Sequence, residues 1–261
     1  MEIDLRDRVA IVTGAGRGIG REIARTLAAE GVTVVATDIT QNQLDEIAAE
    51  WKQNGWAGQQ YLWDVTSSDE VLAVVHAIDQ SIGRIDILIN NAGIAGGSMV
   101  ETMDDDVWQA NLSVNLSGTM KMCRAVIPAM KRQQAGRIIN AASFAAIIPS
   151  VGGAAYAASK AGVESLTRVL AGELGPFGIT VNCYAPGMIP TEMNHFAERE
   201  AGEQQRLLDT LSLRRWGEPK DVANLVCFLA SDLASYITGT MIDVSGGKFA
   251  TQMHCRAHRK P

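Results

Sequence analysis

A glycine-rich turn between an apolar run and an amphipathic segment constrains the fold more than any other stretch of the sequence. Residues 9–12 (Val-Ala-Ile-Val) suit a strand that is buried on both faces of a parallel sheet. Residues 14–20 (Gly-Ala-Gly-Arg-Gly-Ile-Gly) follow, and residues 23–28 continue with the apolar spacing of a helix. A strand, a glycine turn and a helix in this order place free N–H groups where they can bind a diphosphate. The turn alone would be weak evidence, but its context predicts a nucleotide site.

The same alternation of strand and helix continues through the first half of the chain. Strands are expected at residues 32–37, 61–63 and 85–89, with helices at 41–53 and 67–82 between them. This order implies a parallel sheet with right-handed crossover connections. The polar residues that follow each strand would then gather at the carboxyl edge of the sheet, where ligands bind in such folds.

The second half adds three strands, which makes a sheet of seven. We expect a helix from about Asn115 to Arg132, a helix that carries Tyr156 and Lys160, and a helix from Pro219 to Leu229; the strands are expected at 136–143, 179–184 and 241–244. Residues 188–215 are charged and weakly periodic, which indicates a mobile helical flap over a substrate, and residues 250–261 form a frayed tail. No repeat or linker interrupts the chain, so residues 1–261 are predicted to form one α/β domain.

Composition narrows the classes of partner. A net charge of −6 and an isoelectric point near 5.3 argue against nucleic acid and against anionic membranes. No apolar run approaches the ~20 residues that span a bilayer, and strand-like sequence begins by Arg8, which leaves no room for a signal peptide. The four cysteines (Cys123, Cys183, Cys227 and Cys255) lack zinc-site spacing, and His254 and His258 in the tail are too weak a signal for a metal site. We therefore expect a cytoplasmic protein without a metal.

Tyr156 and Lys160 are the strongest candidates for chemistry. They lie four residues apart, so on a helix both side chains project from one face. A free phenol has a pKa of about 10, and a neighbouring ammonium favours the phenolate and lowers that pKa. Ser143, thirteen residues upstream, can supply a hydroxyl to the same substrate oxygen. For an isolated pair, an exposed Tyr and Lys on an ordinary helix is the better interpretation; the other motifs favour catalysis.

Two further polar residues allow alternative interpretations. Asp38 ends the second expected strand, about 20 residues beyond the glycines, where an acid can bind the ribose hydroxyls of a nucleotide. Taken alone, Asp38 would be better interpreted as the N-cap of the following helix, residues 41–53. Asn115 stands between Val114 and Leu116, so it is expected to be partly buried and to need hydrogen-bond partners; a bond to local backbone would satisfy it as well.

Taken together, the motifs make the chain similar to the short-chain dehydrogenase/reductase family over nearly its whole length. The resemblance rests on residues 13–20, Asp64, residues 90–93 (Asn-Asn-Ala-Gly), Asn115, Ser143, residues 156–160 and residues 186–187. It implies a doubly wound Rossmann fold and an oxidoreductase that uses a nicotinamide cofactor. It also implies a homotetramer that pairs the helices starting near Asn115 and Tyr156.

The resemblance assigns roles to matching positions. Asn115, Ser143, Tyr156 and Lys160 would be catalytic: Tyr156 exchanges a proton with the substrate, Lys160 lowers the Tyr156 pKa and bonds the nicotinamide ribose, Ser143 stabilises the substrate oxygen, and Asn115 holds a water that leads to Lys160. The residues implied to bind the cofactor are Gly14, Arg17, Gly18, Ile19, Gly20, Asp38, Asp64, Val65, Asn91, Ala92, Gly93, Tyr156, Lys160, Pro186, Gly187, Ile189 and Thr191.

The substrate is expected over the nicotinamide and under the flap. The lining implied by the resemblance consists of Ile94, Ala95, Ser143, Phe144, Ala145, Ile148, Tyr156 and Met188. None of these side chains is charged, so an ionised substrate would lose hydration without compensation. We therefore predict a small neutral secondary alcohol or ketone, such as a polyol, a sugar or a cyclic hydroxyketone. Arg199, Arg206 and Arg214 in the flap are expected on a solvated helix face.

Two alternatives to this function remain open. An NADPH-dependent 3-oxoacyl-(acyl-carrier-protein) reductase resembles this chain in every motif, but such enzymes usually have an arginine where this chain has Gly172. A nucleotide sensor without catalysis would be expected to have a damaged set of catalytic residues, whereas here the set is complete.

The choice of cofactor sets Asp38 against Arg17. A 2′-phosphate beside Asp38 would cost roughly 4 kcal/mol per charge pair at about 4 Å and an effective dielectric near 20, before screening. Even a quarter of that is a several-fold preference, since about 1.4 kcal/mol is tenfold. Arg17 can reach such a phosphate, but it is long and free to turn to solvent or to pair with Asp38. We predict NAD as the cofactor, with NADP as the alternative.

Overall fold

Seven parallel strands form one sheet in the protein, whose computed structural model describes residues 3–194 and 196–251. The strands are β1 (Val9–Thr13), β2 (Thr33–Asp38), β3 (Gly58–Leu62), β4 (Ile87–Asn90), β5 (Gly136–Ala141), β6 (Ile179–Pro186) and β7 (Met241–Val244). Their order is β3-β2-β1-β4-β5-β6-β7, so the direction of winding reverses between β1 and β4. The predicted doubly wound parallel sheet is confirmed, and its crevice for ligands lies at this reversal.

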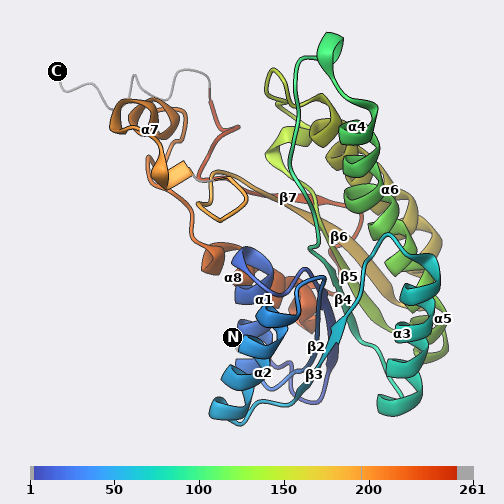
Figure 1. Ribbon diagram of the computed structural model, residues 1–261. Helices are drawn as coiled ribbons and strands as arrows, with labels where there is room; N and C mark the ends of the chain where they lie inside the picture. The colour runs from blue at the N-terminus through green and yellow to red at the C-terminus, as the bar shows by residue number, and fades with distance from the viewer. Residues whose placement is uncertain (1–2, 195, 252–261) are drawn as a thin grey trace.

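Helices cover both faces of the sheet (Figure 1). One layer holds α1 (Gly18–Ala29), α2 (Gln41–Asn54) and α8 (Pro219–Ala230); the other holds α3 (Ser68–Ile82), α4 (Asp105–Asn111), α5 (Thr119–Gln133) and α6 (Ala154–Leu174). The strand side chains alternate between the two layers: Ala10 and Val12 pack in the core under α1 and α8, whereas Ile11 packs in the core under α3 and α5. Strands buried on both faces account for the continuous apolar runs in the sequence.

The long helix expected from Asn115 begins ten residues earlier, which corrects that prediction. Asp104 caps α4, because its side chain accepts a hydrogen bond from the backbone N–H of Asp106. The chain then passes through a π-helical segment, η2 (Leu112–Gly118), directly into α5. The first turns of this helix are polar, so they carry no apolar periodicity that would reveal them. Single π-helical turns are often found at functional sites, and this one carries Asn115.

The flap is helical in part, but it begins later than predicted. Met188 and Ile189 follow the end of β6 at Pro186 and are buried, and Ile189 packs in the core under α1 and α8. Beyond them come η5 (Phe196–Glu198) and α7 (Ala201–Leu208), which projects away from the sheet (Figure 1). None of the residues of α7, all of which are described, is buried. Most of the predicted tail, residues 252–261 with His254, Cys255 and His258, lies outside the described residues.

The remaining short helices connect these elements. They are η1 (Val100–Thr102), η3 (Phe144–Ala146), η4 (Gly175–Phe177) and η6 (Asp232–Ala234). No helix within residues 3–194 and 196–251 is long and apolar enough to cross a membrane. Cys123, Cys183 and Cys227 are free and buried, as expected for small core residues.

Candidate active site

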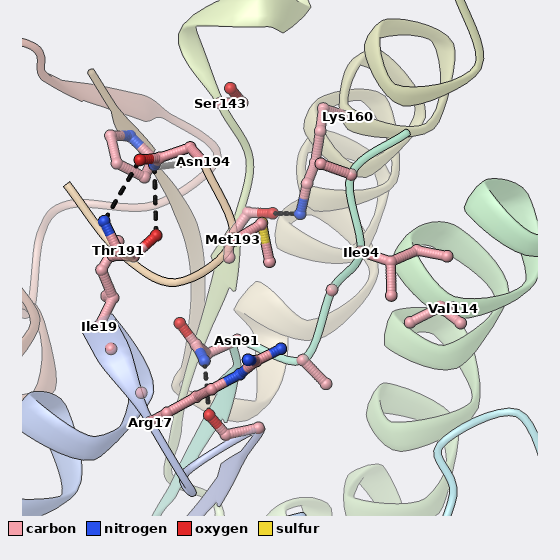
Figure 2. A pocket seen from close by; sticks show the side chains of 18 of the residues that line it. Arg17, Ile19, Asn91, Ile94, Val114, Ser143, Lys160, Thr191, Met193 and Asn194 are labelled. Atoms are coloured by element: carbon pink, nitrogen blue, oxygen red, sulfur yellow. Dashed lines mark hydrogen bonds between the residues drawn. The ribbon is translucent and has the colours of Figure 1, made fainter. Parts of the chain in front are cut away.

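A cavity of about 460 Å³ opens at the carboxyl edge of the sheet, where the winding reverses (Figure 2). Every residue predicted to bind the cofactor lines this cavity, from Gly14 in the glycine turn to Thr191 beyond β6. Segments far apart in the sequence therefore meet where the alternation of strands and helices predicted a ligand site. The cavity divides into a side formed by the ends of β1, β2 and β4 and a side formed by the flap and the loop after β5.

The glycine turn at the first side needs its glycines. Gly14 and Gly18 adopt positive φ angles of 62° and 54°, which side chains disfavour. A Cβ atom on Gly20 would lie 2.1 Å from the backbone oxygen of Gly14. The amide of Asn91 donates hydrogen bonds to the backbone oxygens of Thr13 and Gly14, at 3.2 and 3.0 Å. The turn is thus held by contacts that no larger residue would permit.

The first turn of α1 can receive an anion. Its N-cap residue is Arg17, and within the described part of the chain this side chain makes no capping hydrogen bond. The first N–H groups of a helix have no partner within the helix, and together with the helix dipole they favour a phosphate. Gly18, Ile19 and Gly20, which carry the first of these N–H groups, line the cavity. The residues present therefore fit the diphosphate of a dinucleotide.

Asp38 is fixed at the end of β2. Its two carboxylate oxygens accept backbone N–H groups, Oδ2 from Gly16 at 3.0 Å and Oδ1 from Thr40 at 3.1 Å. Each oxygen retains a further lone pair that can accept a ribose hydroxyl. Arg17 does not pair with Asp38, which had been one of its expected alternatives. Instead, its Nη1 lies 3.0 Å from Oε2 of Glu192.

Ser143, Tyr156 and Lys160 come together at the other end of the cavity. Lys160 is buried on α6, and its Nζ donates a hydrogen bond to the backbone oxygen of Ala141 at 2.7 Å. The same Nζ lies 5.8 Å from the centre of the Tyr156 ring. Ser143, at the end of β5, accepts a hydrogen bond from the N–H of Ala145 at 3.2 Å through its Oγ. The segment after β5 and helix α6 thus bring a hydroxyl, a phenol and an ammonium to one place.

The pKa of Tyr156 runs opposite to the predicted direction. Burial raises the pKa of Tyr156 above its ordinary value, and the hydroxyl of Ser143 offsets part of this rise. Burial also lowers the pKa of Lys160 to about 8. Lys160 Nζ donates to the backbone oxygen of Ala141, and burial and the Ser143 hydroxyl set the direction of the Tyr156 pKa shift. The predicted lowering by Lys160 is therefore not found here.

Asn115 lies one layer behind the cavity. It is fully buried, and its amide exchanges hydrogen bonds with Ile94: Nδ2 donates to the Ile94 oxygen at 3.0 Å, and Oδ1 accepts from the Ile94 N–H at 2.8 Å. Nδ2 also donates to Oγ of Ser159 at 2.9 Å, and the Ser159 hydroxyl donates to the backbone oxygen of Tyr156 at 2.7 Å. The expectation that Asn115 is buried and needs partners is confirmed. It ties the loop after β4 to α6.

Two residues predicted for the substrate pocket lie elsewhere. Ile94, Ala95, Phe144 and Ala145 line the cavity. Met188 does not, since the β6 end turns it into the core beside a second, smaller cavity. Ile148 does not either, because it lies on the loop after η3 with 47 % of its surface exposed. Sequence spacing places both residues near the site, but it does not show whether their side chains face the cavity or point away from it.

Several lining residues were not predicted. Trp63, Val114 and Ser150 line the cavity, and so do Glu192, Met193, Asn194 and Phe196 from the flap. Asn194 holds the flap's first turn, since its Nδ2 donates to the Ile189 oxygen at 2.7 Å. Its Oδ1 accepts from the Thr191 N–H at 3.2 Å (Figure 2). Trp63 could have been found as the neighbour of Asp64 at a strand end. The flap residues gave no signal, because their segment has weak periodicity.

Comparisons with known proteins agree with this geometry. Residues 14–248 match a family model described as enoyl-(acyl carrier protein) reductase. The chain is 40 % identical to the 3-oxoacyl-[acyl-carrier-protein] reductase FabG of Pseudomonas aeruginosa, over 95 % of this chain and 99 % of the relative. It is 39 % identical to the FabG of Thermotoga maritima, over 93 % and 98 %.

A solved structure is similar over the same range. It is a candidate short-chain alcohol dehydrogenase of Sinorhizobium meliloti 1021, 34 % identical, with a TM-score of 0.91 over 95 % of this chain and 99 % of that one. The fold, the cavity at the sheet edge and relatives that cover almost the whole chain all point one way: the protein belongs to the short-chain dehydrogenase/reductase family of NAD(P)-dependent oxidoreductases.

Proposed function

We propose that the enzyme interconverts a ketone and a secondary alcohol, with Tyr156 as the group that moves the proton. The observation that carries this proposal is the convergence of Ser143, Tyr156 and Lys160 beside Gly93, at the inner end of a cavity that fits a dinucleotide. A nicotinamide bound there supplies or accepts the hydride. The residues of the chain then have to orient the substrate and manage one proton.

In the reducing direction, the phenol of Tyr156 donates its proton from Oη to the carbonyl oxygen of the substrate. The Ser143 hydroxyl donates a hydrogen bond to that oxygen and stabilises the negative charge that develops on it. Lys160, fixed by its bond to Ala141, would hold the nicotinamide ribose with its remaining N–H donors. Alcohol oxidation uses the same groups in reverse, with the phenolate as base.

The cofactor would be held along the length of the cavity. The N–H groups at the start of α1 would bind the diphosphate, and Asp38 would accept the hydroxyls of the adenosine ribose. Asp64 and Val65 would contact the adenine, and Thr191 the carboxamide of the nicotinamide. The anchored carboxylate of Asp38 favours NAD over NADP, because a 2′-phosphate would meet a fixed negative charge.

The relatives favour a 3-oxoacyl thioester as the substrate, reduced at its ketone. The proteins of Pseudomonas aeruginosa and Thermotoga maritima are named for this reaction on a carrier protein. The cavity supports it, since Ile94, Ala95 and Phe144 offer uncharged surface next to Tyr156 for an acyl group. We therefore put this substrate class first, ahead of the small neutral alcohols that the sequence favoured.

A small neutral secondary alcohol or ketone is the second candidate. The observation in its favour is Gly172 on α6, where related carrier-protein reductases usually have an arginine. A side chain at Gly172 would meet nothing within 4 Å, so an arginine would fit there. Although there is room for an arginine, this chain lacks it and so lacks that contact with an acidic carrier protein.

We further propose a cytoplasmic homotetramer that pairs the helical faces of α5 and α6.

One panel of assays separates these substrates. The purified enzyme is given NADH or NADPH with acetoacetyl thioesters of a carrier protein and of coenzyme A, and with small neutral ketones; NAD and NADP are tested with polyols. We expect the highest kcat/KM with a 3-oxoacyl thioester and NADH. Higher kcat/KM for a polyol than for both thioesters would establish the second candidate. No turnover with any member, despite measurable cofactor binding, would refute the proposed reaction.

A further inference from the structure

An ion pair joins the glycine turn to the flap across the mouth of the cavity. Arg17 Nη1 and Glu192 Oε2 lie 3.0 Å apart, although 175 positions separate the two residues in the sequence. Both side chains line the cavity. They are also 53 % and 64 % exposed, so water reaches the pair and substitution leaves no buried charge.

Neighbouring contacts hold the two residues in register. A Cβ atom on Gly18, next to Arg17, would lie 3.5 Å from Cγ2 of Thr191, which precedes Glu192. Asn194 fixes the backbone of Thr191 through the hydrogen bond to its N–H. The turn and the flap therefore approach each other closely at this point, and Glu192 lies opposite Arg17 because of that packing.

The arginine of the pair is next in sequence to a residue that binds Asp38. Gly16, which precedes Arg17, donates its N–H to the carboxylate of Asp38. Arg17, the cation of the glycine turn, thus directly follows the residue that binds the acid expected to contact the 2′-hydroxyl. With Glu192 in place, the charges of Arg17, Glu192 and Asp38 sum to −1. Without Glu192 they sum to zero, and the guanidinium gains donors that can bind a phosphate bidentately.

We infer that Glu192 is a second determinant of cofactor choice, which acts by keeping Arg17 from a 2′-phosphate. The inference rests on the proposed preference for NAD. Asp38 would repel the 2′-phosphate directly. Glu192 pairs with Arg17 of the glycine turn, so this arginine is not free to bind the phosphate. The two acids come from opposite sides of the cavity, so cofactor choice depends on the flap as well as on β2.

The test measures cofactor binding rather than turnover. Dissociation constants for NAD and NADP are determined by calorimetry for the native protein, Glu192→Gln, Arg17→Gln/Glu192→Gln and the control Glu200→Gln, an exposed flap acid at the start of α7. We expect Glu192→Gln to bind NADP about threefold to tenfold more tightly. Its affinity for NAD should change less than twofold, the control should match the native protein, and the double variant should lose the gain. Added salt should weaken the gain, because both charges are exposed.

A second measurement follows the ion pair without any cofactor. Hydrogen exchange of the amides in residues 191–194 should be faster in Glu192→Gln than in the native protein and in Glu200→Gln, while thermal unfolding stays unchanged. Unchanged NADP affinity in Glu192→Gln would overturn the inference, and so would a gain that persists in the double variant. Stronger native binding of NADP than of NAD would instead refute the proposed NAD preference, and the comparison of variants would still decide the role of Glu192.

Discussion

The two sides of the cavity are built differently. On the cofactor side, polar side chains are anchored to backbone at the ends of strands: Asp38 accepts two N–H groups, and Asn91 donates to the glycine turn and accepts from the buried hydroxyl of Tyr184. The substrate side consists of a loop and the flap, where large apolar side chains remain exposed. They are Met193, which lines the cavity, and three residues of the loop after β5 that do not line it, Ile147, Ile148 and Val151.

This difference separates two tasks. A sheet edge has little freedom, so the cofactor side presents a fixed pattern of donors and acceptors before anything binds. The flap side buries few side chains, and regions with few buried contacts open at lower free energy than core strands do. Substitutions on the cofactor side should therefore change which nucleotide binds. Substitutions on the flap side should change affinity and turnover together.

Tyr156 lies where the two sides meet, and its loss should have the largest effect. Tyr156→Phe keeps the ring but removes the Oη that moves the proton. We expect kcat to fall by at least about 10²-fold, the scale of general acid–base groups, while cofactor affinity stays within twofold. Tyr61→Phe, which loses a hydroxyl on β3 that bonds Gln59, is the matched control. Near-native turnover in Tyr156→Phe would remove the proposed mechanism.

The comparison also explains what the sequence could predict. Asp38 and Asn91 were found because apolar runs mark strands, and parallel strands bring their carboxyl ends to one edge. Glu192 and Asn194 were missed, since their positions depend on how the flap packs against the glycine turn. The direction of the Tyr156 pKa shift was missed for a similar reason: sequence spacing shows that Lys160 is near, but burial is decided by the whole fold.

The proton step should give the two reaction directions opposite dependences on pH. Oxidation needs the Tyr156 phenolate, which becomes more abundant as pH rises, and reduction needs the phenol. Because burial raises the pKa of Tyr156, the rise in oxidation should continue into the alkaline range, by up to about tenfold per pH unit where hydride transfer limits the rate. Ser143 lowers the Tyr156 pKa, so Ser143→Ala should move both profiles to higher pH. Profiles of equal slope in the two directions would contradict this assignment.

On the cofactor side, Asp38→Asn should erode the preference for NAD. The substitution removes the charge but keeps an oxygen that can accept an N–H from the turn. We expect the ratio of kcat/KM for NAD to that for NADP to fall by about tenfold, since roughly 1.4 kcal/mol of repulsion would be lost. Asp45→Asn, on the exposed face of α2, controls for general loss of negative charge. An unchanged ratio would show that the choice of cofactor is not made at the end of β2.

The smallest effect is expected on the flap side, at Asn194. Its amide joins the backbone of Ile189, Thr191 and Phe196, so Asn194→Ala removes the bonds that hold the flap's first turn. Net contributions of such bonds are about 1 kcal/mol, and we expect KM for cofactor and substrate to rise together by about threefold to fivefold. Thermal stability should hardly change, because the flap adds few buried side chains to the core. Gln205→Ala, which loses an exposed contact within α7, is the control and should match the native enzyme. If only the KM for the substrate rose, the first turn of the flap would serve one side of the cavity alone. The two sides would then be more independent than their shared contact through Thr191 implies.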